Sequence, residues 1–138
     1  MAEGSTTPDL AQLAQRLADA INAGDIDAVM GFYAPYAVFE VPETFGTFEG
    51  RAAIRALFED WLGAYDEFRV EGEAKDLGNG VNFGVVVQHG RPRGGTGWVQ
   101  FRYGNVSTVV GGLIERTTQY LDIDEARAAA ERLAEERG

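Results

Sequence analysis

The stretch covering residues 36–65 constrains the fold more than any other part of the chain. It reads as a short strand from Val38 to Val41, a glycine-closed loop, and then one strongly amphipathic helix over residues 50–65. Large apolar side chains recur on one face of that helix at spacings of three and four residues: Ile54, Leu57, Phe58, Trp61, Leu62 and Tyr65. Burying each of them gains roughly 1.5–3 kcal/mol relative to exposure. A stripe this wide needs a broad apolar partner, which the β-rich second half of the chain can supply.

Two helical segments are expected before this stretch. Thr7-Pro8-Asp9 resembles a helix start, with a capping hydroxyl, proline at the first helical position and an acid facing the helix dipole. Gly24 suits the end of that helix, and Asp25 can cap a second, shorter one that turns Tyr33 inward and stops at Ala34-Pro35.

After residue 65 the hydrophobic period changes from 3.6 to 2, which indicates strands. We expect them over residues 68–74, 81–89, 98–110 and 113–122, with turns at 78–80 and 111–112, a mobile loop at 90–95 and a bulge at Gly104-Asn105. Asp122 or Asp124 then caps a final helix. The order predicts an α+β fold in which a curved antiparallel sheet wraps around the helices, with a short C-terminal helix.

We expect one domain over residues 1–138, with residues 1–6 frayed. The opposite face of the sheet also carries apolar residues, so a homodimer is a reasonable expectation.

Charge and composition exclude several classes of function. The net charge of −10 repels phosphate backbones and anionic lipids, so neither nucleic acid nor membrane is expected as a partner. The absence of cysteine removes disulfides and thiolate chemistry, and no metal or cofactor site is expected. The first residues lack the basic and apolar regions of a signal peptide, and no apolar run approaches the roughly 20 residues that span a bilayer, so a cytoplasmic location is expected.

Three strings resemble the nuclear transport factor 2-like superfamily, in particular its SnoaL-like and ketosteroid-isomerase-like members. They are AINAGDIDAVMGFYAPYAVFEVP, GTFEGRAAIRALFEDWLGAY and IERTTQYLDIDEA. The resemblance implies a cone-shaped α+β barrel with a mostly apolar pocket, commonly a homodimer. Members include isomerases, dehydratases, epoxide hydrolases, polyketide cyclases and catalytically inert binders, and the fold alone cannot choose among them.

The residues that ketosteroid isomerases use are missing here. By resemblance, the tyrosine that donates to the oxyanion falls on Leu17, the general base falls on Val41, and the second acid falls near Asn105–Val106. A positioned base contributes roughly 10²–10⁴ in rate and an oxyanion donor a similar factor. The sequence therefore gives no basis for that isomerisation.

Other chemistries of the superfamily leave few candidates. His89 is the only histidine, a residue type that exchanges protons near neutral pH, and it is the candidate general base; the alternative is a partly exposed histidine at a strand end. Arg116 and Asp122 could form part of an epoxide-hydrolase-like relay, or only a structural ion pair. Strand alternation turns Glu40 away from the vacant base position beside it, which favours a salt bridge.

The side chains expected to line a pocket are mostly aromatic or aliphatic, and core packing would explain many of them equally well. They are Leu17, Tyr33, Val41, Phe45, Phe58, Trp61, Asn105, Arg116 and Tyr120.

Two functions stay open on this reasoning. The first is a small-molecule-binding protein for an apolar cyclic compound, with acid–base chemistry through His89 as its catalytic form. The second is a non-catalytic assembly module that uses the outer sheet face. An enzyme should show an enclosed cavity of several hundred Å³ with convergent polar groups, whereas a structural module should have that space filled.

Overall fold

The chain was analysed as a computed structural model, which describes residues 9–41 and 46–138. In the described residues, four helices and six strands follow one another in the order α1 (Leu10–Asn22), α2 (Ile26–Met30), β1 (Tyr33–Val41), β2 (Gly46–Glu49), α3 (Arg51–Gly63), β3 (Tyr65–Gly78), β4 (Val81–Pro92), β5 (Val99–Val110), β6 (Leu113–Tyr120) and α4 (Ile123–Glu136).

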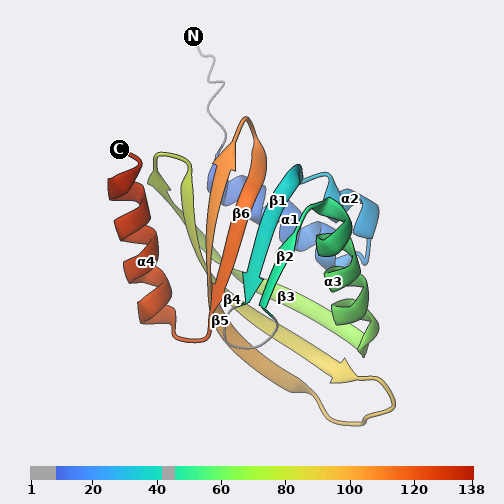
Figure 1. Cartoon of the computed structure of the whole chain (residues 1–138). Coiled ribbons are helices and arrows are strands. Elements are labelled where there is room, and N and C mark those ends of the chain that lie inside the picture. Colours follow the sequence, from blue (N-terminus) through green and yellow to red (C-terminus); the bar gives the residue numbers. More distant parts are fainter. Residues whose placement is uncertain (1–8, 42–45) are drawn as a thin grey trace.

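The strands form one curled sheet in the order β2-β1-β6-β5-β4-β3. Strands β3 to β6 are antiparallel neighbours, while β1 runs parallel to β6 and antiparallel to β2. Figure 1 shows α1, α2 and α3 on one side of this sheet and α4 alone on the other. We call the first side the concave face and the second the outer face. The predicted α+β class, the curled sheet and the C-terminal helix are confirmed.

The N-terminal helices begin at aspartates. The Asp9 carboxylate accepts hydrogen bonds from the backbone N–H groups of Ala11 (3.0 Å) and Gln12 (3.2 Å), so Asp9 is the cap of α1 and Leu10 its first residue. The predicted cap, Thr7, and the predicted first residue, Pro8, lie outside the described residues, as do residues 1–6, which were expected to be frayed. Asp25 caps α2 as expected, through the N–H of Ala28.

Strand β1 begins earlier than the sequence predicted. Tyr33 is its first residue and not the end of α2, because α2 already ends at Met30. The chain continues through Pro35, which lies where the pairing with β6 shifts, between Tyr33 and Val38. Proline cannot donate to a sheet ladder and is tolerated at such an irregularity. The loop expected after β1 also contains strand β2, which pairs with residues 38–41.

Two features of the later strands differ from expectation. Strand β4 runs on to Pro92, so the loop expected at residues 90–95 is partly strand. Pairing of β4 with β5 is continuous through Gly104 and Asn105, where a bulge was predicted. The irregularity lies instead between β5 and β6, where Thr108 pairs with Arg116 and the next residue pairs with Ile114. Glu115 is the extra residue there, and this keeps both Ile114 and Thr117 on the concave face.

Each face of the sheet has its own core. On the concave side, Ile54 and Phe58 of the α3 stripe are fully buried, with Phe58 packing against Tyr33 and Phe39. Trp61 is half-buried and stacks between Phe58 and Phe68 at ring-centroid distances of 5.5 Å. The outer face carries a second cluster, made by Val81, Phe83 and Val106 of the sheet and by Ala126, Ala130 and Ala134 of α4. Among the described helices, none combines the length and apolar character that crossing a membrane requires.

Candidate functional site

Helix α1 lies across the concave face and is tied to strand β3 at one end. The Asn22 side chain donates to the carbonyl of Val70 (2.9 Å) and accepts from its N–H (2.7 Å). These two bonds use both backbone groups of a buried strand residue, so they fix the position of the helix end over β3. The rest of α1 spans the hollow of the sheet.

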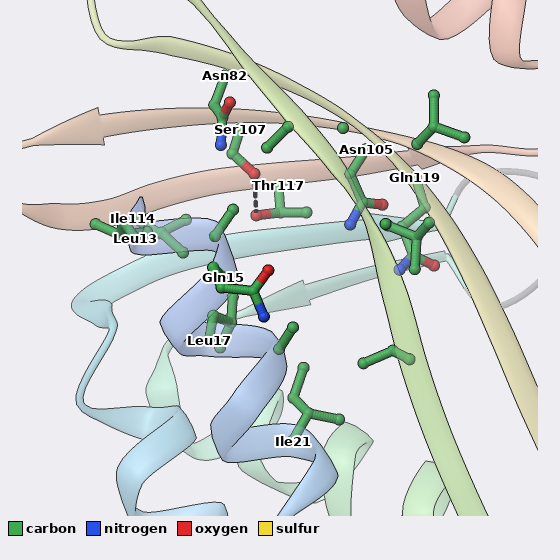
Figure 2. A pocket seen from close by; sticks show the side chains of 18 of the residues that line it. Leu13, Gln15, Leu17, Ile21, Asn82, Asn105, Ser107, Ile114, Thr117 and Gln119 are labelled. Carbon is green, nitrogen blue, oxygen red and sulfur yellow. Dashed lines mark hydrogen bonds between the residues drawn. The ribbon is translucent and has the colours of Figure 1, made fainter. Parts of the chain in front are cut away.

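A partly open cavity of about 140 Å³ lies between α1 and the concave face. Its helix side is almost entirely aliphatic, formed by Leu13, Ala14, Leu17, Ala18 and Ile21. Tyr33, Phe39, Phe58 and Trp61 close another wall. Gln15 on α1 is exposed at the rim (Figure 2).

The sheet side of the cavity is polar but uncharged. Amide and hydroxyl side chains from three neighbouring strands share this face, namely Asn82, Asn105, Ser107, Thr117 and Gln119. The register brings them together, because Ser107 pairs with both Asn82 and Thr117, and Asn105 pairs with Gln119. The hydroxyls of Ser107 and Thr117 are hydrogen-bonded to each other at 2.9 Å (Figure 2).

Two amide oxygens of this polar strip have no partner. Asn82 donates through Nδ2 to the carbonyl of Leu10 (3.3 Å), which leaves its Oδ1 buried and unbonded. Asn105 Oδ1 is also buried without a hydrogen-bond partner. An unsatisfied buried acceptor costs about 1–3 kcal/mol of stability, so two in one cavity call for an explanation.

The two tyrosines of the cavity stay protonated over the physiological range. Burial raises the pKa of Tyr33 well above its ordinary value, and the nearby Tyr103 raises it further. Burial likewise raises the pKa of Tyr103, opposed in part by a side-chain hydrogen bond with Gln119. Neither phenol can therefore act as a base at neutral pH.

No charged side chain of the described residues is directed into the cavity. The only charged residues along its lining are Glu71 and Glu73, both exposed on β3. Their pairing partners on β4 are Val87 and Val85, which belong to the outer face. In addition, no group of histidine and acidic residues in the described part of the chain is arranged to hold a metal ion.

Five of the side chains expected to line a pocket do lie around this cavity: Leu17, Tyr33, Phe58, Trp61 and Asn105. Val41 is buried in the same core but does not line the cavity. Phe45 falls outside the described residues.

Arg116 and Tyr120, also expected in the pocket, lie on the outer face. They line a groove of about 400 Å³ between α4 and the sheet, together with Glu40. Arg116 forms an ion pair with Glu40 (2.8 Å), which also accepts from the hydroxyl of Thr118 (3.1 Å). Asp122 caps α4 through the N–H of Glu125. The structural role expected of these residues is found in part, since Arg116 forms an ion pair with Glu40 and not with Asp122. Strand alternation places residues 116, 118 and 120 on the face opposite to Thr117 and Gln119.

His89 does not reach the cavity either. It lies on the outer face of β4, the side that also carries Val81 and Phe83, and its Nε2 is 3.3 Å from a carboxylate oxygen of Glu71. The expected position at the pocket mouth is wrong, since the alternation of β4 that buries Phe83 under α4 carries His89 to the same side.

Sequence reasoning missed most of the polar strip. Asn82, Ser107, Thr117 and Gln119 resemble the solvated positions of alternating strands, which is how such residues usually behave. A signal was nevertheless present: uncharged polar residues recur on one face of three consecutive strands, beside Gly84, where charged residues would normally appear on a solvated face.

The family model of the SnoaL-like domain matches residues 14–117. No curated protein matches the chain. Among solved structures, a putative polyketide cyclase from Pseudomonas putida superposes with a TM-score of 0.73 at 18% identity, covering 86% of this chain and 95% of that one.

Two further structures give the same result. A hypothetical protein of ketosteroid-isomerase-like fold from Catenulispora acidiphila, in complex with trimethylamine, gives a TM-score of 0.73 at 17% identity and covers 91% of this chain and 94% of that one. The epoxide hydrolase/cyclase-like enzyme SalBIII, described in pyran ring formation in salinomycin, gives a TM-score of 0.70 at 20% identity and covers 79% of this chain and 87% of that one. At these identities the likeness shows the fold.

Proposed function

The chain belongs to the SnoaL-like domain family, and from this premise we propose that it binds a small, uncharged, ring-sized molecule in the cavity under α1. The observation that carries the proposal is the cavity's two-sided lining. One side is aliphatic, and the polar groups directed into the cavity from the other side are neutral amides and hydroxyls, so an apolar body with a polar edge fits both sides.

The size of the cavity limits the ligand. A volume of about 140 Å³ is smaller than the several hundred Å³ expected for an enzyme of drug-sized substrates. Engineered apolar cavities of about 150 Å³ bind benzene. The enclosed part of the ligand is therefore about one six-membered ring.

The lining supports binding more than acid–base catalysis. Ketosteroid isomerase activity is not expected, since Leu17 and Asn105 lie at the cavity without a phenol or carboxyl group. Tyr33 and Tyr103 remain neutral, and His89 lies on the other face. A reaction in this cavity would rely on positioning of the bound molecule, as the cyclase names of the structural neighbours would suggest.

A thermal-shift series tests the proposal. Benzyl alcohol, benzoate and benzylammonium share one ring and differ in charge. We expect the alcohol alone to raise the melting temperature, because ligand binding to the folded state stabilises it by about 2.7 kcal/mol at one hundred times the Kd, whereas a charge would have to be buried without a partner. Equal shifts with all three compounds, or none with any neutral ring compound, would contradict the proposal.

Gly84→Ala is the matched cavity-filling variant. A Cβ at this position makes only an ordinary contact, 3.5 Å from the carbonyl oxygen of Glu73, and it occupies the floor of the cavity. We expect the variant to fold normally and to lose the shift given by benzyl alcohol.

The alternative function, an assembly module, is supported by large apolar side chains that remain exposed. Tyr36 is 68% exposed, Trp98 58% and Phe101 51%. We propose that the chain forms a homodimer through the segment that bears Trp98 and Phe101. Light scattering after size-exclusion chromatography should give twice the chain mass for the wild type and the monomer mass for Trp98→Ser; a wild-type monomer at all concentrations would contradict the dimer.

A further inference from the structure

We infer that the ligand of the cavity under α1 carries two hydrogen-bond donors on opposite sides of one small ring, which the side-chain oxygens of Asn82 and Asn105 accept. This inference rests on the proposed function and names the class of molecule that the cavity selects.

The amide of Asn82 decides whether a ligand group beside it must donate or accept a hydrogen bond. Its Nδ2 donates to the Leu10 carbonyl, so the amide cannot turn to present its nitrogen to a ligand without losing that bond. The residue is only 7% exposed, and its oxygen is unbonded. A ligand group that meets Asn82 must therefore donate a hydrogen bond.

Asn105 adds a second acceptor at a defined spacing. Asn82 pairs with Ser107, and Asn105 lies two residues from Ser107 on the same strand and face. Asn82 and Asn105 are thus diagonal neighbours, whose backbones lie about 7–8 Å apart. Donors at the 1 and 4 positions of a six-membered ring are farther apart than donors on adjacent ring atoms, so they match two acceptors at this spacing better.

The space between the two amides is open for such a ring. Gly84, which pairs with Asn105, places no side chain on the floor of the cavity. The neighbouring hydroxyls of Ser107 and Thr117 already bond to each other (Figure 2). The two free acceptors are therefore the oxygens of Asn82 on β4 and Asn105 on β5, and the ring would lie between them over Gly84, against the aliphatic side of α1.

Isothermal titration calorimetry with four single-ring probes tests the inference. Hydroquinone has opposed donors, catechol adjacent donors, phenol one donor, and 1,4-dimethoxybenzene none. We expect hydroquinone to bind at least tenfold more tightly than phenol or catechol, and 1,4-dimethoxybenzene to bind most weakly.

Two variants assign the effect to the amides. Asn105→Leu keeps a side chain of similar size but removes the acceptor, so hydroquinone should lose at least tenfold in affinity and become equivalent to phenol. The ligand-free variant should melt at a higher temperature than the wild type, because an unbonded buried oxygen is gone. Gln100→Leu is the control, because it removes an amide from an exposed position on the same strand. It should change neither the affinity for hydroquinone nor the affinity for phenol.

The results separate the inference from the proposed function. If phenol, hydroquinone and 1,4-dimethoxybenzene bind equally, or if Asn105→Leu keeps the hydroquinone affinity, the donor requirement is wrong while the cavity still binds neutral rings. If none of these probes or any other neutral ring binds, the proposed function itself is wrong.

Discussion

The two faces of the sheet are both covered by helix, but the contacts beneath the helices differ. On the outer face, α4 presents Ala126 and Ala130 to the sheet, and Gly104 of β5 lies directly beneath Ala126. A groove of about 400 Å³ remains there between α4 and strands β5, β6 and β1. On the concave face, α1 crosses a strip of amides and hydroxyls and leaves a cavity of about 140 Å³. The same strands β4, β5 and β6 contribute to both.

The difference shows how the alternating residues of one strand give its two faces different contacts with the covering helices. Small apolar residues permit close contact, and close contact excludes both water and ligands. Amides whose oxygens find no donor in the opposing helix keep part of their hydrogen-bonding capacity unused, at a cost in stability. A fold that retains such amides in a cavity beside a close-packed core is better explained by binding than by packing.

The largest expected effect comes from a pair of glycine substitutions on the two faces. A Cβ at Gly104 would lie 2.5 Å from the Cβ of Ala126, so Gly104→Val should push α4 away and cost about 3 kcal/mol of unfolding free energy. Gly84→Ala on the concave side should change stability by less than about 1 kcal/mol. Urea unfolding measures both.

The two glycine variants directly test whether the two faces of the sheet are packed differently. Equal losses for the two variants would mean that the concave face is packed as tightly as the outer one, and no binding cavity would then exist in solution.

A second test uses alkaline pH, since buried phenols concentrate on the concave side. Burial raises the pKa of Tyr33 and Tyr103 above the ordinary 10.0, so each stays protonated in the folded state while the unfolded chain ionises. Below pH 10 their contribution is constant. Above it, unfolding releases protons, and stability should fall by up to about 1.4 kcal/mol per tyrosine per pH unit.

Urea titrations between pH 8 and 11.5 would measure this slope. Tyr33→Phe and Tyr103→Phe should each flatten it. An unchanged slope in both variants would place the two phenols in water and not in the core.

The smallest expected effect is that of replacing His89, which lies on the outer face and outside the cavity. His89→Gln removes a partly exposed contact with Glu71, and exposed pairs of this kind are worth less than about 1 kcal/mol. Stability should barely change, and the thermal shift by benzyl alcohol should stay the same. Loss of ligand binding in this variant would mean that the outer face, and not the concave one, carries the site.

Much of the fold could be predicted because its signals are local. The apolar spacing that begins at Ile54 identified α3, and the change to a period of two identified the meander from β3 to β6. Strand β2 was missed because four residues with alternating partial exposure give no strong pattern. The end of α2 was misplaced because Tyr33 continues a helical spacing that the Gly31 cap interrupts.

The site was harder to predict because it depends on which helix covers which face. Strand β4 alternates between two sets that are each compatible with burial, one with Phe83 and one with Asn82 and Val86. Sequence periodicity separates the two sets but does not say which one faces α1. That choice is made by contacts between distant segments, such as the bonds of Asn22 to Val70 and the approach of Gly104 to Ala126.

The parallel pairing of β1 with β6 has a consequence for synthesis on the ribosome. Residues 33–41 obtain their inner neighbour only after residues 113–120 have been made, whereas β3 to β6 can pair as each emerges. Contacts between such distant segments form slowly, and unpaired strand edges invite association. The nascent chain would therefore hold its first three helices and an open strand edge unprotected until translation is nearly finished, which makes this early half the part most in need of a chaperone.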